Sequence, residues 1–412
     1  MDKKEKVKEK GEWTKLKLDN NTITGYTVPI GPFHPALLEG EFFKLKVDGE
    51  RVVDADIKLG YNYRGIMKLA ESRSYWRDLY LVERVCGICS HAHTTCYTRT
   101  VEMLGKIEVP DRARFIRTLV AELERIHSHL LWAGIGMELI GFRTLFMYIW
   151  REREHVLDIL EMISGNRQHY AMNTIGGVRR DVQKDMIPKI MKKISEMKKS
   201  LMKLVEVVVR DPIIRNRTVN VGKLDKDIAR KICVVGPVAR SVGIKMDVRK
   251  DDPYAAYEEV PFDIVTAEDG DVFSMVEVRL REVIESVKIC EYCLDVLTRI
   301  GGDIRTEISE FPVNEAVGRV EAPRGELMYY IVSNGTHIPE RVRIRTPSYM
   351  NDYAILFMLK DQALADAPII IAAVDPCMAC TDRMIHIEDA KSDKKEIISV
   401  YELSKRYRRK EK

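Results

Sequence analysis

The sequence has few of the features that mark a membrane-spanning, secreted or nucleic-acid-binding protein. Its 412 residues contain no apolar run approaching the roughly 18 residues of a membrane-spanning helix, and the charged first residues do not resemble a signal peptide. Lys plus Arg (67) nearly balances Asp plus Glu (63), which leaves a net charge of only +4. We therefore expect a cytoplasmic protein with no transmembrane segment of its own and no nucleic-acid partner.

No internal repeat or low-complexity linker divides the chain, which is long enough to bury a large core. Residues 1–22 are polar and rich in Lys and Glu, so we expect them to form an N-terminal tail. Residues 384–412 are also polar and are expected to form a C-terminal extension. The segment between them, residues 23–383, is expected to fold as a single domain.

Hydrophobic periodicity predicts an α+β fold, mainly α with small β elements. Apolar residues recur at helical spacing in four long segments, which we expect to pack as a bundle: residues 112–140, 145–163, 186–209 and 270–300. Two alternating runs joined at Asp48-Gly49 predict a β-hairpin near the N-terminus, over residues 42–57. Towards the C-terminus we expect three further elements: a hairpin of residues 318–332 and 341–345, a helix over 351–364, and a buried segment over 369–374.

Cysteine is scarce, but four of the eight cysteines form two Cys-x-x-Cys pairs almost three hundred positions apart, Cys86 with Cys89 and Cys377 with Cys380. Thiolates at this spacing bind soft or borderline metals. A large cytosolic enzyme is a poor setting for structural disulfides, so the pairs favour a metal. Folded together, they would form a four-thiolate site for zinc, iron–sulfur or nickel–iron chemistry.

A third Cys-x-x-Cys pair, Cys290 and Cys293, lies within the predicted helix 270–300. No turn-forming glycine or proline stands beside it. We interpret these two cysteines as part of the hydrophobic core rather than as metal ligands.

The residues around the two metal-type pairs narrow the choice of chemistry. The first pair lies in Glu-Arg-Val-Cys-Gly-Ile-Cys-Ser-His-Ala-His, residues 83–93, and the second in Asp-Pro-Cys-Met-Ala-Cys-Thr-Asp-Arg, residues 375–383. Both resemble the metal motifs of nickel–iron hydrogenase large subunits. The Cys-Thr-Asp-Arg ending resembles the energy-converting, membrane-bound branch, which is related to respiratory complex I. The resemblance extends from about Gly25 to Arg383.

This resemblance implies a nickel–iron centre whose iron carries two cyanides and one carbon monoxide. By carry-over from the family motifs, Cys86 and Cys377 would be terminal nickel ligands. Cys89 and Cys380 would bridge nickel to iron.

The resemblance also implies roles for four residues around the metals. Arg324 would face one cyanide, and Ser348 would donate a hydrogen bond to the other. His93 would donate to a bridging sulfur and so tune the metal. Asp375, just before Pro376 and Cys377, would lie over the open coordination position.

A proton carrier with a pKa set by partial burial is needed close to the nickel. Glu39, in Ala36-Leu37-Leu38-Glu39-Gly40-Glu41, resembles the proton-shuttling glutamate of the family. Because the loop is short, Glu41 stays open as an alternative, two residues further on.

Three positions depart from the wider hydrogenase pattern. Met67 and Arg383 stand where many members have the glutamate and histidine that serve an additional magnesium or iron site, so we expect no such ion. Ser128 replaces an aspartate that is common in soluble uptake enzymes. His127 and His129 are two positions apart on a predicted helix and point to different faces, so we do not expect them to bind one metal together.

The leading hypothesis is the catalytic large subunit of a membrane-bound, ferredoxin-linked hydrogenase. Ferredoxin would deliver electrons through 4Fe–4S clusters in a separate small subunit, and protons would be reduced to H2. Further hydrophilic and integral-membrane subunits of a complex I-like assembly would couple this reaction to ion translocation. The chain would then be peripheral, on the cytoplasmic side of the cell membrane.

Three alternatives stay open. A related membrane-bound reductase of sulfane sulfur or polysulfide, with a silent nickel–iron pocket, would account for the residues that follow Arg383, where family precursors are cleaved. A non-catalytic complex I-type scaffold subunit would account for the fold. A structural four-cysteine zinc site would account for the sulfurs, but not for Glu39, Arg324 and Asp375.

Overall fold

We describe the chain from a computed structural model. Its described residues are 15–18, 21–37, 39–308, 310–381, 385–388 and 395–398. Most of the predicted N-terminal tail and C-terminal extension, with Arg383, lies outside these ranges, so the predicted domain limits stay predictions. Within the described residues, no helix is long and apolar enough to cross a membrane.

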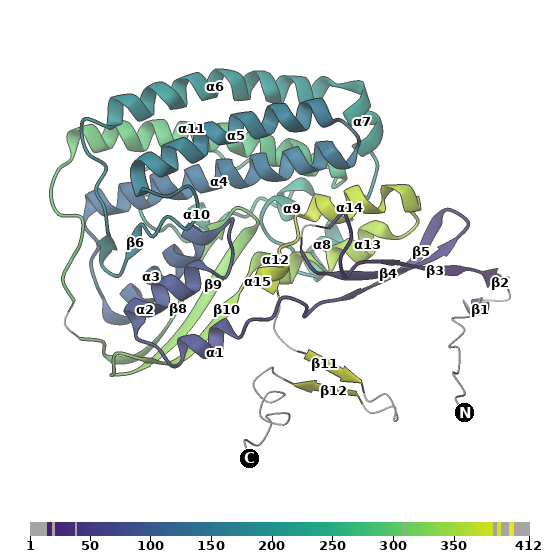
Figure 1. The fold of residues 1–412 in the computed structure, drawn as a ribbon, viewed down its shortest axis with the longest axis horizontal. Coiled ribbons are helices and arrows are strands. Elements are labelled where there is room, and N and C mark those ends of the chain that lie inside the picture. The colour runs from purple at the N-terminus through teal and green to yellow at the C-terminus, as the bar shows by residue number, and fades with distance from the viewer. Residues whose placement is uncertain are drawn as a thin grey trace, which may run out of the picture.

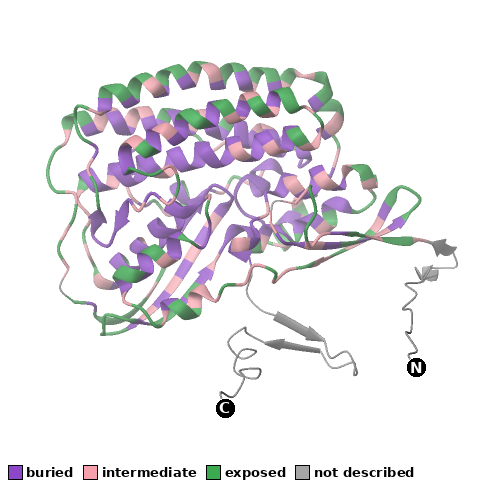
Figure 2. Cartoon of the chain, viewed as in Figure 1, coloured by how far each residue is buried: buried purple, intermediate pink, exposed green. Residues whose placement is uncertain are grey.

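Four long helices form the layer at the top of Figure 1, namely α4 (Asp111–Leu139), α5 (Arg143–Ser164), α6 (Ile187–Arg210) and α11 (Val272–Arg299). Their ranges follow the predicted periodic segments to within a few residues. α6 buries one apolar stripe, including Ile190, Ile194 and Leu201, and its outer face is largely exposed (Figure 2). α4 is buried along most of its length because other elements cover it on several sides. The prediction of an α+β fold with a long-helix core is confirmed.

Two three-stranded antiparallel sheets lie below this layer in Figure 1. The predicted N-terminal hairpin is present as β4 (Phe42–Asp48) and β5 (Arg51–Lys58), and β3 (Tyr26–Ile30) pairs with β4 on its other edge. The second sheet has the order β10-β9-β8 and contains β8 (Val313–Ala322), β9 (Gly325–Asn334) and β10 (Pro339–Arg345). Among the described residues, three short strand pairs complete the β elements: β1 (Lys15–Leu18) with β2 (Asn21–Thr24), β6 (Asn173–Thr174) with β7 (Gly177–Val178), and β11 (Ile385–Glu388) with β12 (Lys395–Ile398).

The predicted second hairpin is present, because β9 pairs with β10 in antiparallel register, but the predicted extent of its first strand is wrong. Residues 318–332 are not one strand, because the chain reverses within them at Pro323-Arg324, where Ala322 pairs with Gly325. Gly325 adopts φ +128°, a conformation open to glycine, and its Cα lies close to the backbone of Gly236. This tight turn places Arg324 at the tip of a hairpin that points into the protein.

The shorter helices connect these layers, and the cysteine pairs lie in or beside them. The first pair lies among α1 (Ile66–Ala70), α2 (Tyr75–Glu83) and α3 (Ser90–Gly105), and α3 packs on β8 and β9. The middle of the chain contains α7 (Pro212–Thr218), α8 (Lys226–Lys231), α9 (Gly236–Ser241) and α10 (Val248–Asp251). The last part contains α12 (Pro347–Asn351), α13 (Ala354–Leu359), a 3₁₀ turn (Leu364–Asp366), α14 (Ala367–Val374) and α15 (Met378–Thr381).

The predicted helix over residues 351–364 is also wrong, because the chain forms α12, α13 and the 3₁₀ turn there instead. α13 ends where the backbone bonds to strand β5: the Asp361 amide donates to the Val52 carbonyl, and the Val52 amide donates to the Gln362 carbonyl. Asp361 has φ +63°, which a helix cannot contain. The buried segment predicted over 369–374 is present as α14, and it leads directly to Cys377.

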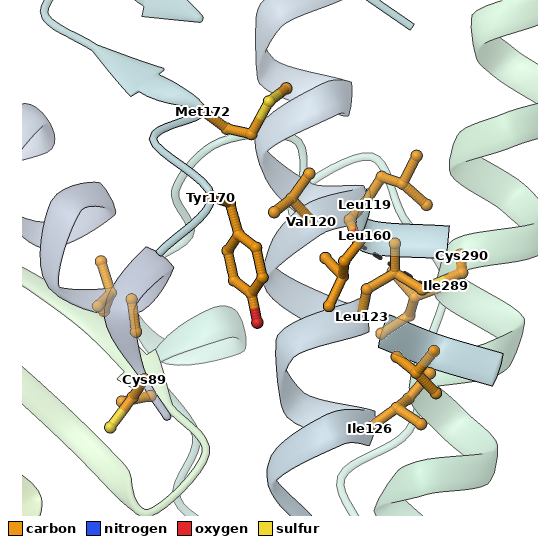
Figure 3. Packing of buried hydrophobic residues seen from close by; sticks show 14 of the residues in the cluster. Cys89, Leu119, Val120, Leu123, Ile126, Leu160, Tyr170, Met172, Ile289 and Cys290 are labelled. Carbon is orange, nitrogen blue, oxygen red and sulfur yellow. Dashed lines mark hydrogen bonds between the residues drawn. The ribbon is translucent and has the colours of Figure 1, made fainter. Parts of the chain in front are cut away.

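The core consists of two hydrophobic clusters. The larger one fills the space between α4, α5 and α11 and extends to α3 and the β8–β10 sheet. Figure 3 shows Leu119, Leu123 and Ile126 of α4 facing Leu160 of α5 and Ile289 of α11. Cys290 and Cys293 are buried in this cluster, as their interpretation as core cysteines predicts. The smaller cluster lies between the β3–β5 sheet and helices α9, α13 and α14.

Candidate metal centre

The fold brings the two cysteine pairs into one buried cluster. Cys86 and Cys89 lie in the loop between α2 and α3, whereas Cys377 and Cys380 lie after α14 and in α15. The Cys86 sulfur is 3.0 Å from that of Cys89 and 3.6 Å from that of Cys377. The sulfurs of Cys86, Cys89 and Cys380 all lie within 4.8 Å of one another. All four thiols are free and at most 5% exposed.

Arg64 joins the two cysteine loops, a role that sequence reasoning missed. Its guanidinium donates to the carbonyls of Arg84 (2.7 Å) and Val85 (2.6 Å) before the first pair. It also donates to the carbonyl of Ala379 (2.9 Å), between the cysteines of the second pair. The only signal in the sequence was that the stretch Gly60–Gly65 precedes the first pair.

Glu124 on α4 holds the other side of the first loop. Its carboxylate accepts hydrogen bonds from the amides of His91 (2.7 Å) and Ala92 (2.9 Å), in the first turn of α3 directly after Cys89. These amides have no partners within their own helix. The position of Cys89 is therefore fixed against the most buried helix of the bundle.

The four thiols differ in how readily they lose a proton. Hydrogen bonds from Cys377, Cys380 and Cys89 stabilise the Cys86 thiolate and hold its pKa well below the usual value for cysteine. A metal bound among the four sulfurs would draw off the remaining protons, since thiolates rather than thiols are metal ligands. The arrangement is that of a thiolate site for a soft or borderline metal.

Arg324 and Asp375 lie against this cluster as a buried ion pair. The Arg324 guanidinium donates to the Asp375 carboxylate (2.7 Å) and to its backbone carbonyl (2.9 Å), and a third nitrogen lies 3.7 Å from the sulfur of Cys89. Asp375 is held at φ +61°, an uncommon conformation for a residue with a side chain. Its second carboxylate oxygen is buried without a partner.

His93 and Ser348 both contact the second pair. One ring nitrogen of His93 (Nε2) lies 3.5 Å from the sulfur of Cys380, and the other (Nδ1) lies 2.8 Å from the hydroxyl of Tyr329. The hydroxyl oxygen of Ser348 accepts from the amide of Cys377 (3.1 Å), so its hydrogen is available to another acceptor. The predicted site residues are thus gathered around the four sulfurs.

The structure distinguishes Glu39 from Glu41. The Glu39 carboxylate accepts from the Ala379 amide (2.9 Å), inside the second cysteine loop, and burial raises its pKa although this bond opposes the shift. Glu39 also lines a surface pocket of about 460 Å³ with Phe33 and His34. Glu41 is 2% exposed and has one carboxylate oxygen without a partner. Of the two glutamates, therefore, only Glu39 contacts both the cysteine loop and a pocket that is open to solvent.

The burial of Glu41 gives a pH-dependent prediction. Burial, and then the charge of Glu39, raise the pKa of Glu41 to about 8. Between pH 4.5, the ordinary pKa of glutamate, and about pH 8, the folded protein keeps a proton on Glu41 that the unfolded chain has released. The stability of the folded state therefore falls as the pH rises through this range. Glu41→Gln, which resembles the protonated acid, should raise the melting temperature by roughly 2–4 °C at about pH 9 and leave it unchanged near pH 5. Melting temperatures measured across this pH range would contradict the prediction if the wild type and Glu41→Gln lost stability in parallel.

His127 and Tyr170 are buried polar residues beside the cluster that sequence reasoning did not assign to it. His127 accepts from Arg153 at Nδ1 (3.0 Å), and its Nε2 is buried without a partner. The Tyr170 hydroxyl is also buried without a partner, and Figure 3 shows it on the side of α4 that faces Cys89. His129 bonds instead to Glu282 (2.9 Å), so the two histidines belong to different networks, as predicted.

These observations fit a metal group bound by the four thiolates. Four soft thiolates offer ligands for two metals through shared sulfurs. Buried polar atoms of Asp375, His127 and Tyr170 lack partners among the residues that the structure describes, and such atoms are normally paired. Met67 lines a small pocket beside Cys380. Because Arg383 lies outside the described residues, the expectation of no additional ion stays a prediction.

Comparisons with known proteins agree with this geometry. The sequence matches the family described as "Respiratory-chain NADH dehydrogenase, 49 Kd subunit" over residues 140–309 and 303–383, and the family "Nickel-dependent hydrogenase" over residues 64–133. It is 40% identical to the membrane-bound hydrogenase subunit alpha of Pyrococcus furiosus, over 88% of this chain and 89% of that protein. It is 38% identical to the carbon monoxide-induced hydrogenase of Rhodospirillum rubrum, over 88% of this chain and 100% of that protein.

A solved structure is similar along the same length. The structure of the membrane-bound sulfane sulfur reductase, an archaeal respiratory membrane complex, contains a chain that superposes with a TM-score of 0.83 at 32% identity, covering 87% of this chain and 98% of that one. The chain belongs to the oxidoreductase family that unites the large subunits of nickel-dependent, membrane-bound hydrogenases with the 49 kDa subunit of the respiratory-chain NADH dehydrogenase.

Proposed function

We propose that this chain is the catalytic large subunit of a membrane-bound hydrogenase that uses electrons from ferredoxin to reduce protons to H2. The observation that carries the proposal is the convergence of four buried thiols with Glu39, whose carboxylate bonds to the loop between two of them. A structural zinc site would need the four sulfurs only.

Cys86, Cys89, Cys377 and Cys380 would hold the metals. A nickel–iron centre bound there would supply redox chemistry and an open coordination position. Burial of all four sulfurs keeps water away from that position. This exclusion strengthens the electrostatic effect of the nearby charges.

The surrounding residues would set charge and hydrogen bonding at the centre. Arg324 places a buried positive charge beside Cys89, and that charge offsets part of the negative charge of the thiolates. His93, oriented by its contact with Tyr329, would donate to the sulfur of Cys380. Ser348 has a hydroxyl hydrogen to offer a ligand of the iron.

Glu39 would carry protons between the solvent-open pocket and the cysteine loop. Its raised pKa increases the fraction of protonated acid near neutral pH, and a proton donor needs that form. The carboxylate would receive a proton on the side of Phe33 and His34 and release it beside Cys377 and Cys380.

Electrons would enter near Gly87, which is exposed although both neighbouring cysteines are buried. A small subunit with 4Fe–4S clusters bound over this loop would bring its nearest cluster close to the thiolates. Further hydrophilic and integral-membrane subunits of a complex I-like assembly, with this chain on the cytoplasmic side, would use the released energy for ion translocation.

The second candidate function is reduction of sulfane sulfur or polysulfide, which the similarity to the sulfane sulfur reductase structure favours. The two can be separated with the purified complex and reduced ferredoxin, by measuring H2 with protons alone and sulfide after polysulfide is added. We expect H2 evolution. Sulfide without H2 would establish the second candidate, and neither product would favour a non-catalytic scaffold subunit.

A further inference from the structure

Arg279 on α11 is a fully buried guanidinium whose counter-charges, the carboxylates of Asp375 and Glu282, are each hydrogen-bonded to a different arginine. Arg279 is 0% exposed, and its Nε has no hydrogen-bond partner in the described part of the chain. Glu282, one turn further along α11, is engaged instead by Arg240 (2.7 Å) and His129 (2.9 Å). Burying a cation is unfavourable unless other groups compensate its charge, so the burial of Arg279 requires an explanation.

The C-terminus of α14 supplies part of that compensation. Arg279 donates to the carbonyl of Val374 (3.4 Å), the last residue of α14. Trp132 of α4 donates from its indole nitrogen to the carbonyl of Ala372 (2.6 Å). These carbonyls lie at the negative end of the helix, where a cation is favourable.

The two side chains form one unit. The Arg279 guanidinium stacks on the Trp132 ring at 4.2 Å from its centroid, a favourable cation–π arrangement. Each member therefore restricts the rotamer of the other. The long helices α4 and α11 therefore both bind the C-terminal end of α14.

The held segment is the one that enters the candidate metal centre. α14 ends at Val374, Asp375 follows at φ +61°, and Cys377 is two residues further on. Arg324 holds the same turn through hydrogen bonds to the carboxylate and the carbonyl of Asp375. An uncommon backbone conformation persists only when its surroundings fix it.

We propose that Arg279, stacked on Trp132, is a positioning residue that clamps the C-terminus of α14 and so fixes the turn carrying Asp375 and Cys377. Arg324 orients this turn from the side of the metals, whereas Arg279 and Trp132 hold it from the side of the helix bundle. The clamp acts on the protein itself, so it does not require that the metal be loaded. Its effect on catalysis rests on the proposed function.

The first test measures how fast iodoacetamide alkylates each cysteine in the intact complex, purified from nickel-depleted cells, by peptide mass spectrometry. Arg279→Met should speed modification of Cys377 by at least about tenfold, the factor for losing one charge-assisted hydrogen bond. Cys290 and Cys293, buried in the bundle core, should react as slowly as before. Arg279→Lys keeps the charge and should restore most of the protection, and Trp132→Phe should give an intermediate rate.

Arg281→Met is the matched control, because Arg281 lies on the same helix but is exposed and paired with Glu277. It should change none of the rates. If Arg279→Met accelerated the alkylation of Cys290 and Cys293 as much as that of Cys377, the substitution would have destabilised the whole fold, and the clamp would be disproved. Unchanged alkylation of Cys377 would also disprove it. Should Arg279→Met fail to fold, Arg279→Lys and Trp132→Phe decide the question through the same comparison.

The second test uses the complex from nickel-replete cells. Arg279→Met should retain nickel, displace the infrared bands of the iron-bound diatomic ligands and lower H2 evolution by about 10- to 100-fold, while Arg279→Lys restores the band positions. Wild-type complex without nickel would contradict the proposed function but leave the alkylation result to decide the clamp. Unshifted bands in Arg279→Met would contradict the clamp alone.

Discussion

Cys377→Ser is expected to abolish nickel binding and reduce H2 evolution to background. Serine keeps the size of the side chain but replaces a soft sulfur ligand with a hard oxygen, which stays protonated at neutral pH. The 3.6 Å contact with Cys86 that links the two loops through sulfur would be lost as well. Nickel content and H2 evolution of the purified complex would both be measured.

Cys293→Ser is the matched control for this substitution. Cys293 is equally buried but lies in the hydrophobic core between helices, away from the cluster. We expect this variant to keep its nickel and most of its activity, with a modest loss of stability. Full nickel content in Cys377→Ser would show that the metal is held elsewhere.

Glu39→Gln should lower H2 evolution by about 10²- to 10⁴-fold, the usual contribution of a general acid. Glutamine can still accept the hydrogen bond from the Ala379 amide, but it cannot carry a proton. Nickel content should therefore be unchanged. Initial rates of H2 evolution per nickel would give the comparison.

Glu41→Gln serves as the control for Glu39→Gln, because Glu41 lies two residues away in the same loop. It should retain at least most of the activity and show the gain in stability at high pH that its raised pKa predicts. The opposite pattern, with activity lost in Glu41→Gln and kept in Glu39→Gln, would move the proton-carrying role to Glu41.

Much of the fold could be predicted from the sequence because long helices with one apolar stripe leave a strong periodic signal. α4, α5, α6 and α11 were all predicted on that basis, and Asp48-Gly49 predicted the β4–β5 hairpin. Short elements are different. The turn at Pro323-Arg324 was read as part of a strand, and the helix predicted over 351–364 is interrupted by pairing with Val52, some three hundred residues earlier in the chain.

In the candidate site, too, some residues could be predicted from the sequence and others could not. The four cysteines and their neighbours could be proposed from motifs, which are local in sequence. Arg64, Trp132 and Arg279 could not, because their roles come from contacts with carbonyl groups far away in the chain. Nothing in the spacing of a buried arginine on a helix indicates which carbonyl it will meet. Tyr170 was missed for a related reason, since a loop brings it to the cluster from beyond α5.

Elemental analysis of nickel in the purified complex tests the central claim most directly. Four thiolates around a nickel–iron centre predict about one nickel per chain, accompanied by iron beyond that of the partner clusters. Zinc in its place, or no metal at all in a complex with intact partner subunits, would contradict the hydrogenase account. The four cysteines would then be a retained pocket in an oxidoreductase that acts on another electron acceptor.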